Sequence, residues 1–168
     1  DNSDLNALTA TIQNYVNSYP DCDVILAASA SIGQGEVIIN TLNSMAPNGK
    51  IQLASFDVWD GMAEAFESGS LGCAVGGMSP DALFSFMVLY NAVIGMRMQE
   101  EPVALKQNYI YVTSAEECAI YEKYIDNPDY MVYTAEEIQQ MSRAINPDFT
   151  LEDMEQIMAD YTLEISKD

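Results

Sequence analysis

The chain has 168 residues, no histidine, and 26 acidic against 6 basic residues, which gives a net charge of −20. A surface this negative repels polyanions, so nucleic acid is not expected as a partner and anionic membrane surfaces are disfavoured. Without histidine the chain lacks the commonest general base, the commonest metal ligand, and the Ser-His and Cys-His nucleophile pairs. Apolar residues make up 49% of the chain, enough to bury a sizeable core.

The first predicted elements are a helix over residues 4–18 and a strand over 23–28, separated by Pro20. The strand is a nearly continuous apolar run, which is typical of a parallel strand covered on both faces. A second helix follows, with an N-cap expected from Ser29 to Ser31. Its buried face is predicted from the spacing of four apolar residues, Val37, Ile38, Leu42 and Met45.

The alternation of strands and helices continues through the middle of the chain. We predict a strand over 51–56 ending at Asp57, a helix over 60–68 ending at Gly69, and a strand over 71–75. Short connections between alternating strands and helices favour an α/β fold with an open parallel sheet and flanking helices.

The last part of the chain is predicted to be mainly helical. Ser79 and Pro80 fit the N-cap and first position of a strongly apolar helix over 79–94, and a strand follows over 108–112. Capping-box patterns begin at Ser114, Thr134 and Thr150, and the last two introduce helices over 134–144 and 150–160. We therefore divide the chain into an α/β domain, 1–125, and an acidic helical C-terminal extension, 126–168.

Chemistry is expected where the strands end, because ligands of open α/β sheets bind at the carboxyl ends of the strands. Three clusters stand there: Ser29-Ala30-Ser31, Asp57-Val58-Trp59 and Gly76-Gly77-Met78. No second carboxylate or lysine stands at a matching strand end, so an enzyme using Asp57 is disfavoured. The three cysteines, Cys22, Cys73 and Cys118, are too far apart for a zinc motif, and we expect neither metal nor cofactor.

The order of these segments resembles the C-terminal part of the type I periplasmic solute-binding proteins, which bind ribose, galactose and similar ligands. The resemblance is carried by the runs VILAAS…GQGEVIINTL, IQLASFD and SGSLGCAVGGMSPDALFSFMVLYNAVIGM, within residues 5–125. It implies the C-terminal lobe of that fold, which also forms the effector domains of sugar-responsive repressors.

Carried over position by position, the resemblance makes Asp57 the acid that accepts hydrogen bonds from sugar hydroxyls. Ser29 stands where the family usually has Asn, and Gly77 where it usually has Gln. Both positions can therefore make fewer side-chain hydrogen bonds to a ligand than in the family. Trp59 is expected to offer a stacking face, and Ser31 a further contact. Structural roles compete with these: helix capping for Asp57, Ser29 and Ser31, packing for Trp59, and backbone conformation for Gly77.

The function implied by the resemblance is that of a non-catalytic, extracytoplasmic solute-binding component of an ABC-type importer. A sugar or related small polar molecule is the expected ligand, and the full-length protein is expected to be a membrane-anchored lipoprotein. The alternative is a ligand-sensing effector domain of a regulator or receptor with the same fold, although the basic DNA-binding segment of a repressor is not seen here. The expected partners are an N-terminal lobe, missing from this sequence, and a transporter permease.

The helix over 79–94 needs a partner of its own, because it is apolar around most of its circumference. In the resembled family this segment crosses to the N-terminal lobe. Left uncovered, it would expose a larger apolar patch than soluble monomers tolerate. We expect it to pack on the tail helices or on a second copy of the chain, as a homodimer through helix 79–94.

Overall fold

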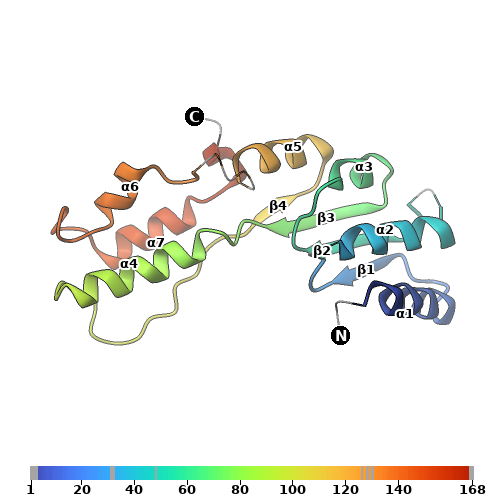
Figure 1. The fold of residues 1–168 in the computed structure, drawn as a ribbon, viewed down its shortest axis with the longest axis horizontal. Helices are drawn as coiled ribbons and strands as arrows, with labels where there is room; N and C mark the ends of the chain where they lie inside the picture. The colour runs from blue at the N-terminus through green and yellow to red at the C-terminus, as the bar shows by residue number, and fades with distance from the viewer. Residues whose placement is uncertain are drawn as a thin grey trace. The chain divides into compact units, whose positions relative to one another are not determined.

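The computed structural model describes residues 4–30, 33–47, 49–125, 127, 129 and 131–166. The chain forms two compact units. Unit 1 comprises Asp1–Gly76 and Tyr111–Tyr121, and unit 2 comprises Gly77–Ile110 and Glu122–Asp168. The colours of Figure 1 show how the chain contributes to them.

A four-stranded sheet, in the order β1-β2-β3-β4, organises the α/β part of the chain (Figure 1). Its strands are β1 (Val24–Ala27), β2 (Gln52–Phe56), β3 (Leu71–Gly76) and β4 (Ile110–Val112). β2 pairs in parallel with both β1 and β3, with Val24 opposite Gln52 and Leu53 opposite Leu71. The predicted α/β class with an open, mostly parallel sheet is therefore confirmed.

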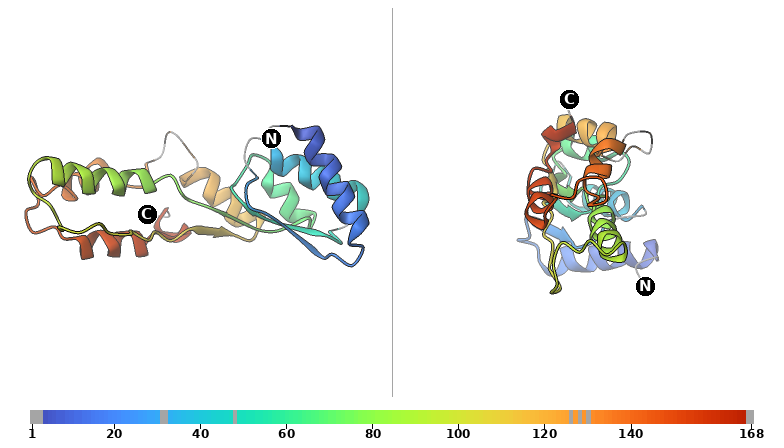
Figure 2. Two further views of the ribbon diagram at one scale, coloured as in Figure 1. Left: turned by 90° about the horizontal axis from the view of Figure 1, so that it is seen from below. Right: turned by 90° about the vertical axis from the view of Figure 1, so that its left-hand side faces the viewer.

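The helices of unit 1 build its core with the sheet. They are α1 (Leu5–Ser18), α2 (Gln34–Met45), α3 (Met62–Glu67) and α5 (Ala115–Tyr124), whose last residues belong to unit 2. α1 lies along α2, as Figures 1 and 2 show. Leu42 of α2, Leu53 of β2 and Met62 of α3 are fully buried. This core fixes the ends of β1 and β2, where the predicted site lies.

Two predictions in this region are wrong. β1 is not covered on both faces: it is an edge strand, and Val24 and Leu26 are 54% and 73% exposed. An apolar run alone does not show how much of each face of a strand is covered by other elements. Nor does Ser29 cap α2, because that helix begins later and has Gly33 at its N-cap position, with φ of 77° and no side-chain cap. Ser31 lies outside the described residues.

Unit 2 is a helical assembly around α4 (Asp81–Val93), with α6 (Ala135–Gln140), α7 (Leu151–Ala159) and the 3₁₀ turn η1 (Leu163–Ser166). α4 is shorter than predicted, and Pro80 rather than Ser79 occupies its N-cap position. The Phe84 ring of α4 meets Tyr133 edge-on at 5.6 Å between ring centroids. Burial, together with Glu137 and Asp160 nearby, raises the pKa of Tyr133 to about 12, so this ring packs as a neutral phenol.

The tail is also tied to α4 by the fully buried Asn91. Its Nδ2 donates to the carbonyl oxygen of Met141 at 2.9 Å, and its Oδ1 accepts from the backbone N–H of Arg143 at 2.8 Å. Both ends of the buried amide are thereby satisfied, as burial requires. The tail, orange to red in Figure 2, therefore covers one face of α4, as one of the two expected partners.

The capping boxes predicted at Thr134 and Thr150 are confirmed at α6 and α7. At α5 the pattern is only partly realised: Glu117 N–H donates to Ser114 Oγ at 3.1 Å, but the Glu117 carboxylate accepts from the N–H of Thr113. Within the described part of the chain, no helix has the length and apolar character needed to cross a membrane.

Candidate functional site at the carboxyl ends of β1 and β2

The structure brings together Ser29 and Asp57, two of the residues predicted at strand ends. Ser29 Oγ donates a hydrogen bond to Asp57 Oδ2 at 3.0 Å. The main chain holds the two segments in place: Ala30 N–H donates to Phe56 O at 2.9 Å, and Asp57 N–H to Val75 O at 2.9 Å. The serine hydroxyl is exposed and the aspartate partly so, which leaves both within reach of a solute.

Asp57 also has an unusual backbone. Its φ is 78°, and among the described residues it alone is a non-glycine with positive φ. Such a conformation costs about 1–2 kcal/mol for an L-residue, although Asp tolerates it better than most. Strain of this kind collects at functional sites, where surrounding structure enforces it. The sequence contains no clear signal for it beyond an Asp at a strand end.

Trp59 packs on the first turn of α2. A Cβ atom added at Gly35 would overlap the indole ring, so the ring lies directly on that backbone. Trp59 nevertheless remains partly exposed. The structure therefore shows the packing role for one part of the ring, and the stacking role stays a prediction.

Gly77 belongs to unit 2, whereas Ser29, Asp57 and Trp59 belong to unit 1. Its φ is 85°, and an added Cβ would approach Ile110 at 3.0 Å and Tyr161 at 3.1 Å. Its carbonyl oxygen accepts a hydrogen bond from Gln107 Nε2 at 3.3 Å. Backbone conformation and close packing thus account for this glycine within its own unit.

A groove of about 500 Å³ runs from Ser29 along β1, between α1 and α2. That volume lies in the range of small-molecule sites. Its walls are largely apolar, from residues such as Leu8, Ile12 and Leu26, while Ser29 and Gln34 supply polar atoms. Sequence reasoning missed Gln34, because the preceding glycine makes it the first residue of α2 rather than an interior helical residue.

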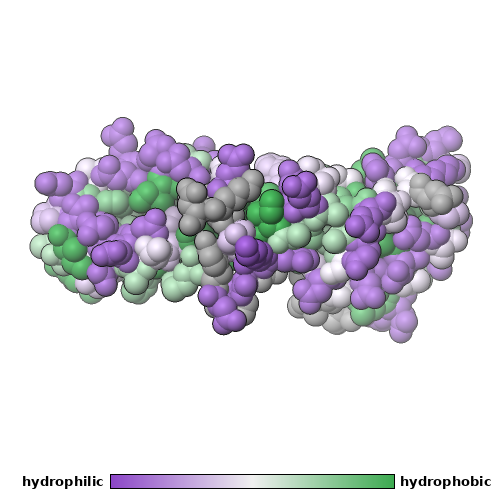
Figure 3. All heavy atoms as spheres, turned by 90° about the horizontal axis from the view of Figure 1, so that it is seen from above, coloured by the Kyte–Doolittle hydropathy of each residue, from purple (hydrophilic) through white to green (hydrophobic). Residues whose placement is uncertain are grey.

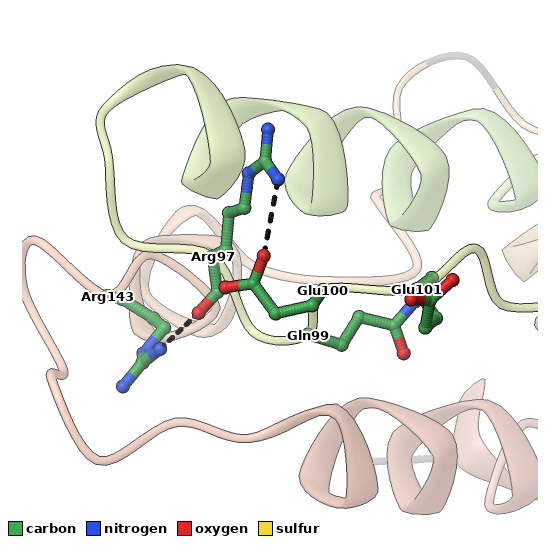
Figure 4. A network of polar contacts seen from close by, with 5 residues as sticks. All are labelled: Arg97, Gln99, Glu100, Glu101 and Arg143. Carbon is green, nitrogen blue, oxygen red and sulfur yellow. Dashed lines mark hydrogen bonds and ion pairs between the residues drawn. The ribbon is translucent and has the colours of Figure 1, made fainter.

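A second hollow, of about 450 Å³, gathers Arg97 and Arg143 in unit 2. Arg143 uses its guanidinium on main-chain carbonyls: Nη1 donates to Arg97 O at 2.6 Å, and Nε and Nη2 donate to Pro147 O at 3.2 and 3.0 Å. Arg97 in turn pairs with Glu100 at 3.5 Å (Figure 4). These contacts connect the loops around α4. The guanidinium groups of Arg97 and Arg143 are therefore already engaged within the chain and have little capacity to bind an anion.

The arrangement at Ser29 and Asp57 offers hydrogen-bonding groups to a ligand. A carboxylate has two acceptor oxygens, and a serine hydroxyl can both donate and accept. No group of three metal-ligating side chains occurs in the described ranges. No protein-family model matches the chain, and no curated protein matches it.

Proposed function

We propose that this chain is a non-catalytic, extracytoplasmic solute-binding component of an ABC-type importer, which binds a sugar or related small polar ligand. The observation that carries the proposal is the Ser29–Asp57 hydrogen bond at the carboxyl ends of adjacent parallel strands. Ligands of open α/β sheets bind at this edge. The positive φ of Asp57 supports a functional role, because a purely structural position would favour glycine or relaxed geometry.

The chemistry of the pair indicates the ligand class. Ser29 occupies one oxygen of Asp57, and the other oxygen accepts from a donor such as a sugar hydroxyl. A neutral ligand that carries hydroxyl groups can donate to this carboxylate oxygen, whereas an anionic ligand would be repelled by Asp57 and by the net charge of −20. The groove beside Ser29 offers apolar surface for the carbon face of such a ligand.

A thermal-shift panel of pentoses, hexoses, nucleosides and polyols tests the proposal on this chain. A ligand that binds only the folded state stabilises it by about 2.7 kcal/mol at about 100 times its Kd, so saturating concentrations should raise Tm by several degrees. We expect Asp57→Asn and Ser29→Ala to abolish the shift. Asp60→Asn removes the same charge three residues along the chain and should leave the shift intact.

The outcome that contradicts the proposal is equally definite. If no member of the panel shifts Tm, or if the shift survives Asp57→Asn, the site does not bind solutes as stated. Recovery of the ligand after long incubation separates binding from turnover. An unchanged ligand supports a binding protein, and a converted one would make the chain an enzyme.

A further inference from the structure

Unit 2 has a further hollow, of about 490 Å³, at the start of α4. It is lined by the first turns of α4, by the segment that leads into β4, and by Met158 of α7. Phe84 and Met158 contribute buried apolar surface to it. Its volume lies in the range of small-molecule sites. This hollow belongs to unit 2 alone, whereas the groove beside Ser29 belongs to unit 1.

Two opposite charges line this hollow without neutralising each other. Asp81 is the first residue of α4, and Lys106 lies in the segment before β4. Both residues are exposed. In the part of unit 2 that the structure describes, neither side chain makes an ion pair or a hydrogen bond, and the ion pair found there joins Arg97 to Glu100. A ligand in the hollow can therefore pair with both charges at once.

Hydrogen-bond acceptors accompany Asp81 in the lining of the hollow. Ser85 follows Asp81 by four residues on α4, so the two side chains lie on the same face of the helix. Gln107 donates from Nε2 to Gly77 O at 3.3 Å, and its Oε1 is a buried acceptor with no hydrogen-bond partner among the described residues. Buried acceptors normally have a donor. These three acceptor groups match the three N–H bonds of a protonated amine.

We propose that this hollow binds a zwitterionic amino acid with an apolar side chain. The ammonium group of the ligand lies against Asp81 and the acceptors of Ser85 and Gln107. The carboxylate pairs with Lys106, and the side chain packs on Phe84. A simple anion would be repelled by Asp81 and by the net charge of −20, and a simple cation by Lys106, whereas a zwitterion satisfies both charges. The proposal does not rest on the function proposed for unit 1.

Isothermal titration calorimetry with L-leucine and three analogues tests the ligand class. We expect L-leucine to bind. N-acetyl-L-leucine lacks the ammonium group and L-leucinamide lacks the carboxylate, so each should bind at least about tenfold more weakly because a charged hydrogen-bonded pair is lost. Glycine should also bind at least about tenfold more weakly, because it has no side chain to bury. No binding of L-leucine, or equal binding of any of the three analogues, overturns the proposal.

Charge-removing variants locate the site. Asp81→Asn and Lys106→Gln should each weaken the binding of L-leucine by at least about tenfold. Glu101→Gln and Lys50→Gln are the matched controls: each removes an exposed charge of the same sign outside the hollow and should leave the affinity unchanged. Circular dichroism would verify that all four variants fold. Binding of L-leucine that survives both Asp81→Asn and Lys106→Gln overturns the proposal.

Two further measurements separate a lost charge pair from a general disturbance. L-leucinamide has no carboxylate, so Lys106→Gln should not weaken its binding, and a loss of its binding would contradict the assigned role of Lys106. Ser29→Ala, which alters the site in unit 1, should leave the binding of L-leucine unchanged. Loss of L-leucine binding in Ser29→Ala would place the amino acid in unit 1 and overturn the proposal.

Discussion

Asp57 combines a left-handed backbone conformation with an exposed hydrogen bond to Ser29. Replacing it by glycine removes the strain of φ 78° together with the carboxylate. We expect Asp57→Gly to leave the free energy of unfolding unchanged or to raise it by up to about 1 kcal/mol, while solute binding is lost. Denaturant unfolding and ligand titration measure the two effects separately. A large loss of stability would mean that Asp57 is chiefly structural.

Residue chemistry at strand ends could be predicted from the sequence, but residue conformation could not. The pairing of Ser29 with Asp57 follows from two parallel strands that end at one edge, so the convergence is predictable. The contact between Trp59 and Gly35 depends on how α2 sits over the loop after β2, and no local pattern encodes it. Ser29 was also expected to serve as a helix cap, yet the left-handed Gly33 starts α2 instead.

At the scale of elements, the capping box of α7 makes a pH-dependent contribution. Asp153 accepts from both Oγ1 and N–H of Thr150, and these hydrogen bonds hold the pKa of its carboxyl below the usual value. Because the folded pKa is lowered, the contribution is present above the unfolded pKa and disappears as pH falls through the folded pKa.

We therefore expect Thr150→Ala to destabilise the chain by about 1 kcal/mol at neutral pH. The difference between this variant and the unaltered chain should shrink in acid, where protonated Asp153 can no longer serve as an acceptor of full strength. Unfolding by urea at neutral and acidic pH measures it. A difference that stayed constant with pH would assign the effect to the threonine hydroxyl alone.

Most helices and strands could be predicted because their signals are local. Capping boxes marked α6 and α7, and Gly69, with φ of 75°, follows α3 as expected. How far other elements cover the faces of a strand is not a local property, and so β1 was wrongly expected to be covered on both faces. The buried hydrogen bonds of Asn91 to Met141 and Arg143 likewise join segments 50 and 52 residues apart.

For the whole molecule, the net charge of −20 means that the carboxylates of the folded chain repel one another, which lowers its stability. Hydrophilic residues predominate on the surface drawn in Figure 3, so much of this charge is in contact with the surrounding ions. Raising NaCl from about 0.01 M to about 0.15 M shortens the Debye length from about 30 Å to about 8 Å. We expect Tm to rise over this range.

The same rise should be seen at several protein concentrations, which would separate screening within one chain from salt-promoted association. Replacing NaCl by KCl at equal ionic strength should reproduce the result. A flat or falling Tm would indicate that the carboxylates are compensated locally despite the few basic residues.

The interleaving of the two units constrains the order in which they can form during synthesis. Unit 1 is built from two segments, which end at Gly76 and begin again at Tyr111. Unit 2 is completed only by the segment from Glu122 onward. A ribosome must therefore release residues 77–110 before the last strand of the sheet exists. During that interval Phe84 has been synthesised while Tyr133, against which its ring packs, has not. The nascent protein thus passes through a stage in which α4 is uncovered on both sides, the stage at which chaperone protection matters most.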